Sequence, residues 1–191
     1  MNPTNSTKPT SKLAEQIADA SLLRGEFTLR SGRTSSYYLD KYKFSTKPEI
    51  LVKLGSMFAA RIAEVEAQFK DQFGSVTRLA GAELGGIPLV TVAAMETGKP
   101  AIFVRNAKKE YGTAKQVEGE VNKGDVVVFV EDVATTGGQA LEAVEILRSL
   151  GATVPAIISV IDRQEGAREN IEDAGVVFHA LFTKRDLGVE D

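Results

Sequence analysis

The 191-residue sequence contains no cysteine and a single histidine. Without cysteine, neither a disulfide nor a thiolate metal site can form. One histidine excludes histidine-rich metal sites and argues against a Ser-His-Asp triad. The chain also has no apolar run of membrane-spanning length and no apolar signal-peptide core at its start. We therefore expect a cytoplasmic protein with no membrane partner and no dedicated metal cluster.

Excess positive charge is also missing, because the net charge is −3. This excludes the overall basic balance that drives nucleic-acid binding, so we expect no nucleic-acid partner. A small anionic ligand would need a local basic cluster instead. Hydrophobic residues make up 43% of the chain, and its length suits one domain with a sizeable core. We predict a disordered polar tail over residues 1–11 and a single domain over residues 12–191.

The spacing of apolar residues predicts an alternation of strands and helices. We expect a helix over 11–23, two strands around a Ser-Gly-Arg turn over 25–42, and a long helix from Pro48 to Phe69. Strands at 75–82, 100–104, 125–131, 153–162 and 176–182 then alternate with helices at 85–98, 137–151 and 165–175. Such alternation is typical of a parallel sheet covered by helices on both faces. Residues 105–124 are polar, contain three glycines and predict a long irregular loop of functional importance.

The stretch VVVFVEDVATTGGQA, residues 126–140, combines an apolar strand, two acids and a turn of small residues. Ligands of open parallel sheets bind at the carboxyl ends of the strands, where Glu131 and Asp132 are expected. Backbone N–H groups of the turn can approach a ligand closely, and a helix starting near Gly138 adds its positive dipole. This favours a phosphate site beside carboxylates that bind sugar hydroxyls. An ordinary strand-to-helix turn with an acidic cap is the alternative that the residues alone leave open.

This stretch resembles the phosphoribosyl-diphosphate loop of the type I phosphoribosyltransferases. Three further stretches resemble the orotate phosphoribosyltransferases in particular: GEFTLRSGRTSSYYLD, FVRNAKKEYGTAKQVEG and IDRQEGA. The resemblance implies an α/β protein of the type I phosphoribosyltransferase fold, with a mostly parallel sheet flanked by helices. It also implies a small N-terminal hood (residues 12–47), an α/β core (residues 48–191) and a flexible loop over 105–124.

The resemblance also implies a reaction, in which orotate and phosphoribosyl diphosphate give orotidine 5′-phosphate and diphosphate in pyrimidine biosynthesis. Catalysis would rest on charges placed where they develop in the transition state. The implied catalytic residues are Glu131, Asp132 and Lys109. The implied phosphoribosyl-diphosphate site comprises Arg105, Lys109, Tyr111, Glu131, Asp132, Val133, Ala134, Thr135, Thr136, Gly137, Gly138 and Gln139. Mg²⁺, the implied cofactor, would be held mainly by the substrate.

Orotate is an anion, and its carboxylate suits a planar bidentate partner such as Arg163. The implied orotate-binding residues are Thr135, Arg163, Tyr38, Leu39 and Arg30. The family resemblance further implies a homodimer, in which the loop over 105–124 reaches the neighbouring site. Its cluster of Arg105, Lys108 and Lys109 would then serve the partner subunit's substrate.

Two positions depart from the family pattern. Many members carry lysine where this chain has Asn106 and Gly85, so two cationic contacts to the diphosphate are missing. Two other functions share the loop at Glu131 to Gly138. A purine or xanthine phosphoribosyltransferase would not need Arg163 for a substrate carboxylate. A non-catalytic regulator that senses phosphoribosyl diphosphate would need a nucleic-acid surface, against which the net charge argues.

Overall fold

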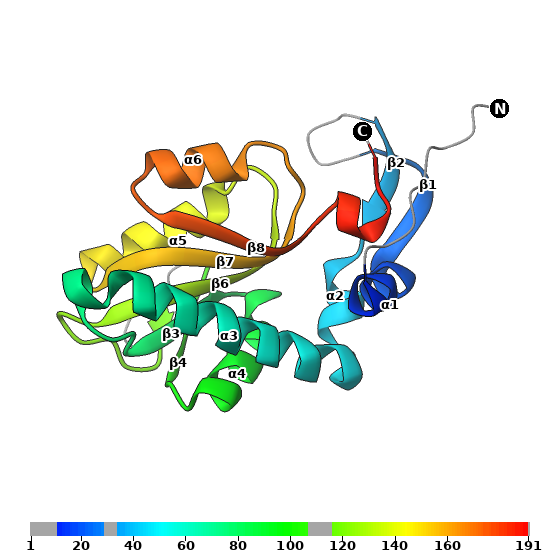
Figure 1. The fold of residues 1–191 in the computed structure, drawn as a ribbon. Coiled ribbons are helices and arrows are strands. Elements are labelled where there is room, and N and C mark those ends of the chain that lie inside the picture. Colours follow the sequence, from blue (N-terminus) through cyan, green and yellow to red (C-terminus); the bar gives the residue numbers. More distant parts are fainter. Residues whose placement is uncertain (1–10, 29–33, 107–115, 191) are drawn as a thin grey trace.

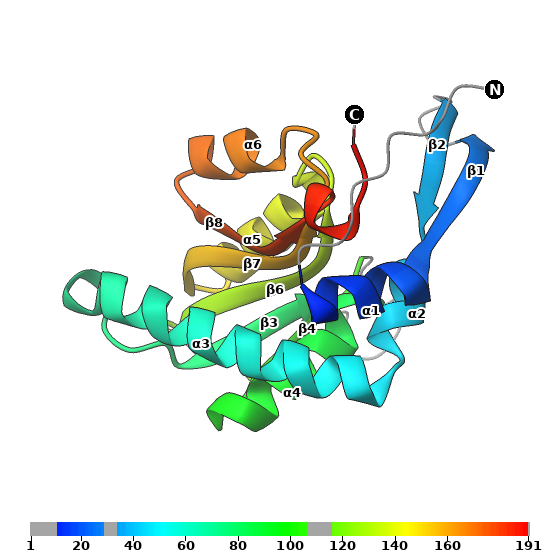
Figure 2. The ribbon, with the colours of Figure 1, turned by 45° about the vertical axis from the view of Figure 1, so that its right-hand side comes forward.

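The computed structural model describes residues 11–28, 34–106 and 116–190. Its N-terminal part is a small unit, the hood (Figures 1 and 2). The hood contains helix α1 (Lys12–Ser21), strands β1 (Leu22–Thr28) and β2 (Thr34–Leu39), and helix α2 (Lys41–Ser45). β1 and β2 pair antiparallel as a separate two-stranded sheet.

The rest of the described chain forms an α/β core around a six-stranded sheet with strand order β5-β4-β3-β6-β7-β8. The strands are β3 (Arg78–Ala82), β4 (Ala101–Val104), β5 (Val117–Glu118), β6 (Val126–Ala134), β7 (Thr153–Asp162) and β8 (Val177–Thr183). The helices are α3 (Pro48–Phe73), α4 (Gly86–Thr97), α5 (Gly138–Ser149), α6 (Ala167–Asp173) and the 3₁₀ turn η1 (Arg185–Leu187). All neighbouring strands run parallel except the edge strand β5. The mostly parallel sheet flanked by helices is therefore confirmed.

The two faces of the sheet build two separate hydrophobic clusters. Val128 and Val130 of β6 pack in a cluster with buried residues of α3 and α4. Val127 and Phe129 pack in a second cluster with buried residues of α5 and α6. The alternation follows from the two-residue period of a strand, and it makes β6 apolar on both faces. Figure 1 shows α3 and α4 on one side of the sheet and α5 and α6 on the other.

Several boundaries differ from the sequence expectation. Ser11 is not part of a tail, because its hydroxyl caps α1 by accepting from the N–H of Ala14. The first helix ends at Ser21, since the next residues pair with β2 instead. The expected loop over 105–124 is shorter, because Val117 and Glu118 pair with β4. Residues 1–10, 29–33 and 107–115 lie outside the described residues.

The end of the described chain packs against the hood, which the sequence did not indicate. Turn η1 contacts α1, and Arg24 of β1 donates to the carbonyl of Gly188. The hood is thus built from both ends of the described chain (Figure 1). None of the described helices is both long and apolar enough to cross a membrane.

A buried carboxylate joins the amino ends of β3 and β6. Asp125 accepts hydrogen bonds from Thr77 Oγ1 at 2.9 Å, Arg78 Nε at 2.6 Å and the backbone N–H of Asn122 at 2.7 Å. Burial favours the neutral acid, but the bonds from Asn122, Arg78 and Thr77 outweigh it and hold the pKa of Asp125 below its ordinary value. The resulting stabilisation is present at neutral pH and is lost as the pH falls through the lowered pKa.

We predict that Asp125→Ala lowers the free energy of unfolding by about 2–4 kcal/mol, because it leaves Arg78 without its main partner in a poorly exposed place. Urea denaturation at neutral pH measures the loss. Asp71→Ala, at an exposed position of α3, is the control and should change stability little. Equal stability of the two variants would contradict the structural role of Asp125.

Candidate functional site

The candidate site lies at the carboxyl end of β6. β6 continues to Ala134, so both acids lie inside the strand rather than after it. Strand alternation gives them opposite surroundings. Asp132 lies close to the start of α4, since a Cβ added at Gly85 would lie 1.6 Å from its Oδ2. Glu131 lines a cavity on the other face, together with Ile157 and Ile171.

Asp132 is only 1% exposed and is paired with a residue of the hood. Lys41 Nζ lies 2.9 Å from its Oδ2 and donates a hydrogen bond to its Oδ1 over 3.2 Å. The backbone N–H of Val133 also donates to Oδ1, at 2.6 Å. Burial would lower the pKa of Lys41, but attraction and hydrogen bonding to Asp132, with a contribution from Glu131, raise it. Lys41 therefore carries a positive charge at neutral pH as the partner of Asp132.

Glu131 is the other buried carboxyl of the site, and it accepts a hydrogen bond from the backbone N–H of Asp132. Burial, followed by the neighbouring charge of Asp132, raises the pKa of Glu131 well above its ordinary value. Two adjacent buried carboxyls repel each other when both are ionised, so Glu131 binds a proton much more tightly than an exposed glutamate. The ammonium of Lys41 lies against Asp132 and also lowers the pKa of Glu131, but burial and Asp132 outweigh this effect.

The turn after β6 encloses a cavity of about 360 Å³, a volume typical of small-molecule sites. Its wall is formed by Glu131, Val133, Ala134, Thr135, Thr136, Gly137, Gly138, Gln139, Ala140, Ile157 and Ile171. Gly137 has a left-handed φ of 78°, and a Cβ there would lie 2.9 Å from Ile171. Asn170 of α6 donates to the carbonyl of Thr136 at 2.8 Å and holds the turn from outside. The first N–H groups of α5 lie at this cavity, and free N–H groups at a helix start suit an anion.

Arg163 follows β7 directly, beside the end of β6. Its N–H donates to the carbonyl of Ala134 at 2.9 Å. Its Nη2 lies 2.9 Å from Glu165 Oε1 and 3.2 Å from the hydroxyl of Tyr37, and its guanidinium lies over the Tyr37 ring. Its Nε is buried and has no hydrogen-bond partner among the described residues. A planar cation with an unused donor is thus held at the same edge as the two acids.

Arg105 and Asn106 lie at the base of the loop, directly after β4. Arg105 follows β4, and its Nη1 lies 3.7 Å from Glu118 Oε1. Asn106 is tied in on two sides, because its N–H donates to Glu83 Oε1 and its side-chain oxygen accepts from Gln139 of α5. Asn106 therefore links the loop base to α5, where the family pattern has a lysine. Three expected site residues, Arg30, Lys109 and Tyr111, lie outside the described residues.

The hood brings an additional aromatic residue, Tyr37, to Arg163. Tyr38 is 46% exposed and packs on Phe27, with ring centroids 5.7 Å apart. Tyr37 and Leu39 are less exposed than Tyr38 and alternate with it along β2. Tyr37, and not Tyr38, is therefore the aromatic residue that contacts Arg163. The sequence signal for it was the two-residue strand period, whereas nothing in the sequence singled out Lys41 or Asn170.

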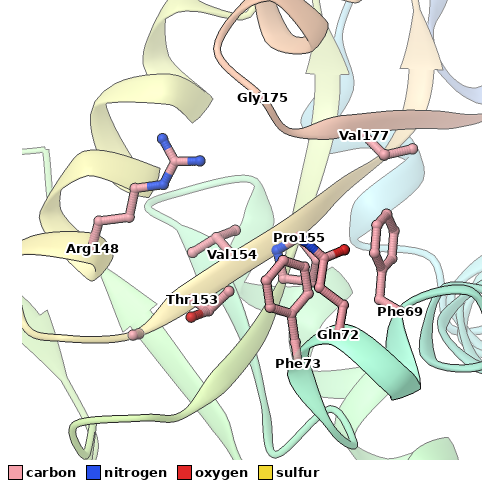
Figure 3. A pocket seen from close by; sticks show the side chains of 10 residues that line it. Phe69, Gln72, Phe73, Arg148, Thr153, Val154, Pro155, Gly175 and Val177 are labelled. Atoms are coloured by element: carbon pink, nitrogen blue, oxygen red, sulfur yellow. The ribbon is translucent and has the colours of Figure 1, made fainter.

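A second cavity, of about 310 Å³, lies at the amino end of β7 (Figure 3). Phe69 and Phe73 of α3 face Pro155 and Val177 there, and Arg148 of α5 lies at the side. It contains neither of the buried acids of β6 nor the glycine turn. Since open parallel sheets bind ligands at the carboxyl ends of their strands, the first cavity is the better candidate.

Comparisons with known proteins show which family the chain resembles. The phosphoribosyl transferase domain family matches residues 53–185. The chain is 44% identical to the orotate phosphoribosyltransferase of Natronomonas pharaonis, over 92% of this chain and 95% of the relative. The crystal structure of orotate phosphoribosyltransferase from Aeropyrum pernix is 34% identical and superposes with a TM-score of 0.75, covering 92% of this chain and 95% of that one.

A third relative was solved with a ligand. The orotate phosphoribosyltransferase of Mycobacterium tuberculosis, in complex with 5-phospho-α-D-ribosyl 1-diphosphate, is 30% identical to this chain. It superposes with a TM-score of 0.72, over 93% of this chain and 98% of that one. Both chains are thus matched over nearly their whole length.

We predict that Gly137→Ala weakens the binding of inorganic phosphate. The left-handed backbone costs alanine about 1–2 kcal/mol, and relief of this strain moves the turn out of its binding conformation. The dissociation constant should rise roughly five- to thirtyfold, which calorimetry can measure. Gly98→Ala is the control, because Gly98 is also left-handed, with φ 68°, but ends α4 in open space. It should cost stability without changing phosphate affinity, and equal effects of both variants would contradict the anion site.

Proposed function

The chain belongs to the orotate phosphoribosyltransferase family, and from this membership we propose that it transfers the phosphoribosyl group of 5-phospho-α-D-ribose 1-diphosphate to orotate. The products are orotidine 5′-phosphate and diphosphate, in pyrimidine biosynthesis. The enzyme is a phosphoribosyltransferase and therefore a glycosyltransferase. A cytoplasmic location stays a prediction from the sequence.

The chemistry needs charges of both signs at one place. Breaking the C1–O bond of the donor builds positive charge on the ribose and negative charge on the departing diphosphate. Glu131 and Asp132 accept hydrogen bonds from the ribose hydroxyls and lie near the developing cation. The turn from Ala134 to Gly138, with the start of α5, binds the 5′-phosphate through its N–H groups. The wall of the cavity supports this assignment, because it contains both Glu131 and the whole turn.

The observation that carries the choice of base is the position of Arg163. Its backbone N–H donates a hydrogen bond to the carbonyl of Ala134 at 2.9 Å. The residue is therefore fixed at the edge of the sheet where the phosphoribosyl group would lie. It offers the planar, bidentate recognition that the carboxylate of orotate requires. An orotate carboxylate would compete with Glu165 and Tyr37 for this guanidinium. Thr135, Tyr38, Leu39 and Arg30 complete the proposed orotate site.

The loop supplies the charges for the leaving diphosphate in this proposal. Arg105, Lys109 and Tyr111 bind the diphosphate, and Lys109 stabilises or protonates it as it departs. Two lysines of the family pattern are replaced by Asn106 and Gly85. The N–H groups of Gly85 and Gly86 at the start of α4 can replace one of these cationic contacts.

The residues fit Mg²⁺ as a cofactor that the substrate brings with it. Among the described residues, no group of three or more His, Cys, Asp or Glu side chains is arranged to hold a metal ion. The side chains of the site are carboxylates and hydroxyls, and Mg²⁺ prefers oxygen ligands and keeps several waters. The diphosphate and ribose oxygens would therefore supply its ligands. Bound there, the ion would neutralise charge on the diphosphate.

An absorbance assay tests the proposed function directly. Orotate should be consumed when the protein is mixed with phosphoribosyl diphosphate and Mg²⁺. Adenine, guanine, xanthine and uracil serve as control bases. Turnover of a purine without orotate turnover would favour a purine or xanthine phosphoribosyltransferase. Binding of phosphoribosyl diphosphate without turnover of any base would favour a regulator.

We predict that Arg163→Ala lowers kcat/KM for orotate by roughly 2–4 kcal/mol in transition-state free energy, because a charge-assisted bidentate contact is lost. The affinity for phosphoribosyl diphosphate should change little. Arg148→Ala, at the opposite end of the sheet, is the matched control and should behave as the wild type. Unchanged orotate turnover in Arg163→Ala would mean that another residue binds the carboxylate.

We also propose a homodimer in which each loop serves the site of the other subunit. Residues 105–115 are charged and poor in apolar anchors, so they gain little by packing on their own subunit. In a two-fold dimer the exchange is reciprocal. Lys109 of one subunit would then act with Glu131, Asp132 and Arg163 of the other.

Complementation between two inactive variants tests the shared site. Lys109→Ala and Asp132→Asn should each be nearly inactive. After mixing under exchange conditions, a mixed dimer has one site with both lesions and one site with neither. Random pairing makes about half the dimers mixed, so activity should recover to about a quarter of the wild-type level. If exchange is verified and activity stays at the level of the single variants, the loop serves its own subunit.

A further inference from the structure

The ion pair between Lys41 and Asp132 connects the hood to the candidate site. Lys41 begins α2, 91 positions from Asp132 in the sequence, and its ammonium lies 2.9 Å from Asp132 Oδ2. Figures 1 and 2 show α2 where the hood meets the core. The lysine side chain is 33% exposed, whereas the carboxylate is 1% exposed. A contact of this kind, with one partner fully desolvated, is stronger than a surface ion pair.

The two oxygens of Asp132 have different surroundings. Oδ1 accepts hydrogen bonds from the backbone N–H of Val133 and from Lys41. Oδ2 is buried and lies 2.9 Å from the ammonium of Lys41. Oδ2 occupies the place that a side chain at position 85 would need, since a Cβ added at Gly85 would lie 1.6 Å from that oxygen. Lys41 therefore contacts both oxygens and holds the carboxylate in one orientation beside the start of α4.

The charges around Asp132 make Lys41 its main support. Glu131 is adjacent in β6, and Asp162 lies at the end of the neighbouring strand β7. α4 and β3 bring no charged side chain to this end, since their only charged residues, Glu96 and Arg78, lie at their other ends. The ammonium of Lys41 contacts Asp132 directly, and its charge also acts on Glu131. Its removal would leave buried carboxylates beside one another without compensation.

We propose that Lys41 is a positioning residue for phosphoribosyl transfer: its ammonium, 2.9 Å from Oδ2, holds the buried Asp132 carboxylate in the orientation in which it binds a ribose hydroxyl of the donor. The inference rests on the proposed function, because it assigns the ribose to Asp132. It extends the proposed function because the hood then acts at the phosphoribosyl-diphosphate site as well as at the proposed orotate site. The hood and the core must then be docked for the donor to bind well.

The test compares Lys41→Met with Lys41→Arg and with a matched control. Lys43→Met removes an exposed lysine from the same short helix, where Lys43 lies 3.9 Å from Asp40. For each protein, calorimetry gives the dissociation constant of phosphoribosyl diphosphate, and steady-state kinetics give kcat/KM for this donor as a function of pH. Thermal unfolding reports whether each variant is folded, and Lys41→Gln replaces Lys41→Met if the latter does not fold.

We expect Lys41→Met to weaken donor binding roughly tenfold or more, the usual effect of removing a supporting partner of a site residue. Loss of the cation makes protonation of the acids easier, so the acid limb of kcat/KM for the donor should move to higher pH. The donor's own titration is the same in every comparison and cancels. Lys41→Arg should restore both affinity and pH limb, and Lys43→Met should match the wild type.

Two results would overturn the role of Lys41. One is an unchanged donor affinity and acid limb in a folded Lys41→Met or Lys41→Gln variant. The other is a Lys41→Arg variant that is as defective as Lys41→Met in both readouts, since a retained charge would then have no effect. Failure of the proposed function is separate: it would appear as a wild-type protein without orotate turnover, while calorimetry would still measure donor binding in every variant.

Discussion

The parallel pairing of β6 with β3 and β7 is the constraint on which the site depends. Strand pairing on both edges holds β6 as far as Val130, and pairing with β7 continues to Ala134. Its apolar residues are needed by both hydrophobic clusters, so the strand cannot shift by one residue without exchanging its two faces. That fixed register decides where its last residues point. Asp132 thereby reaches α4 and the hood, and Glu131 reaches the cavity at α5.

The hood is joined to the core by polar contacts at the site as well as by apolar packing. Lys41 pairs with Asp132, and the hydroxyl of Tyr37 accepts from Arg163. A two-stranded sheet is marginal by itself, and here α1 and α2 cover it only in part. The same contacts that dock the hood therefore also orient the carboxylate of Asp132 and the guanidinium of Arg163. Assembly of the fold and assembly of the site are coupled through these two pairs.

The negative charge of the two acids in β6 is partly neutralised by their surroundings. A single ammonium balances Asp132, while burial and the neighbouring charge favour a proton on Glu131. If a donor develops positive charge on its ribose here, two nearby carboxyl groups would stabilise that charge. The N–H groups of the glycine turn and of the start of α5 provide positive potential only a few residues after the two acids. Both signs are thus available without a protein-bound metal cluster in the described chain.

The sequence by itself determined the alternation of strands and helices, the apolar strand that carries Glu131 and Asp132, and the glycine turn that follows. These are local signals: apolar periodicity, glycine in a turn and short motifs depend on neighbours along the chain. Only the tertiary structure decided which distant residues meet at the site. Lys41, Tyr37 and Asn170 belong to ordinary polar stretches, and β5 pairs with β4 through just two residues. Their roles follow from how the hood, α6 and the sheet edge pack, and a contact between distant segments leaves no periodic mark in either segment.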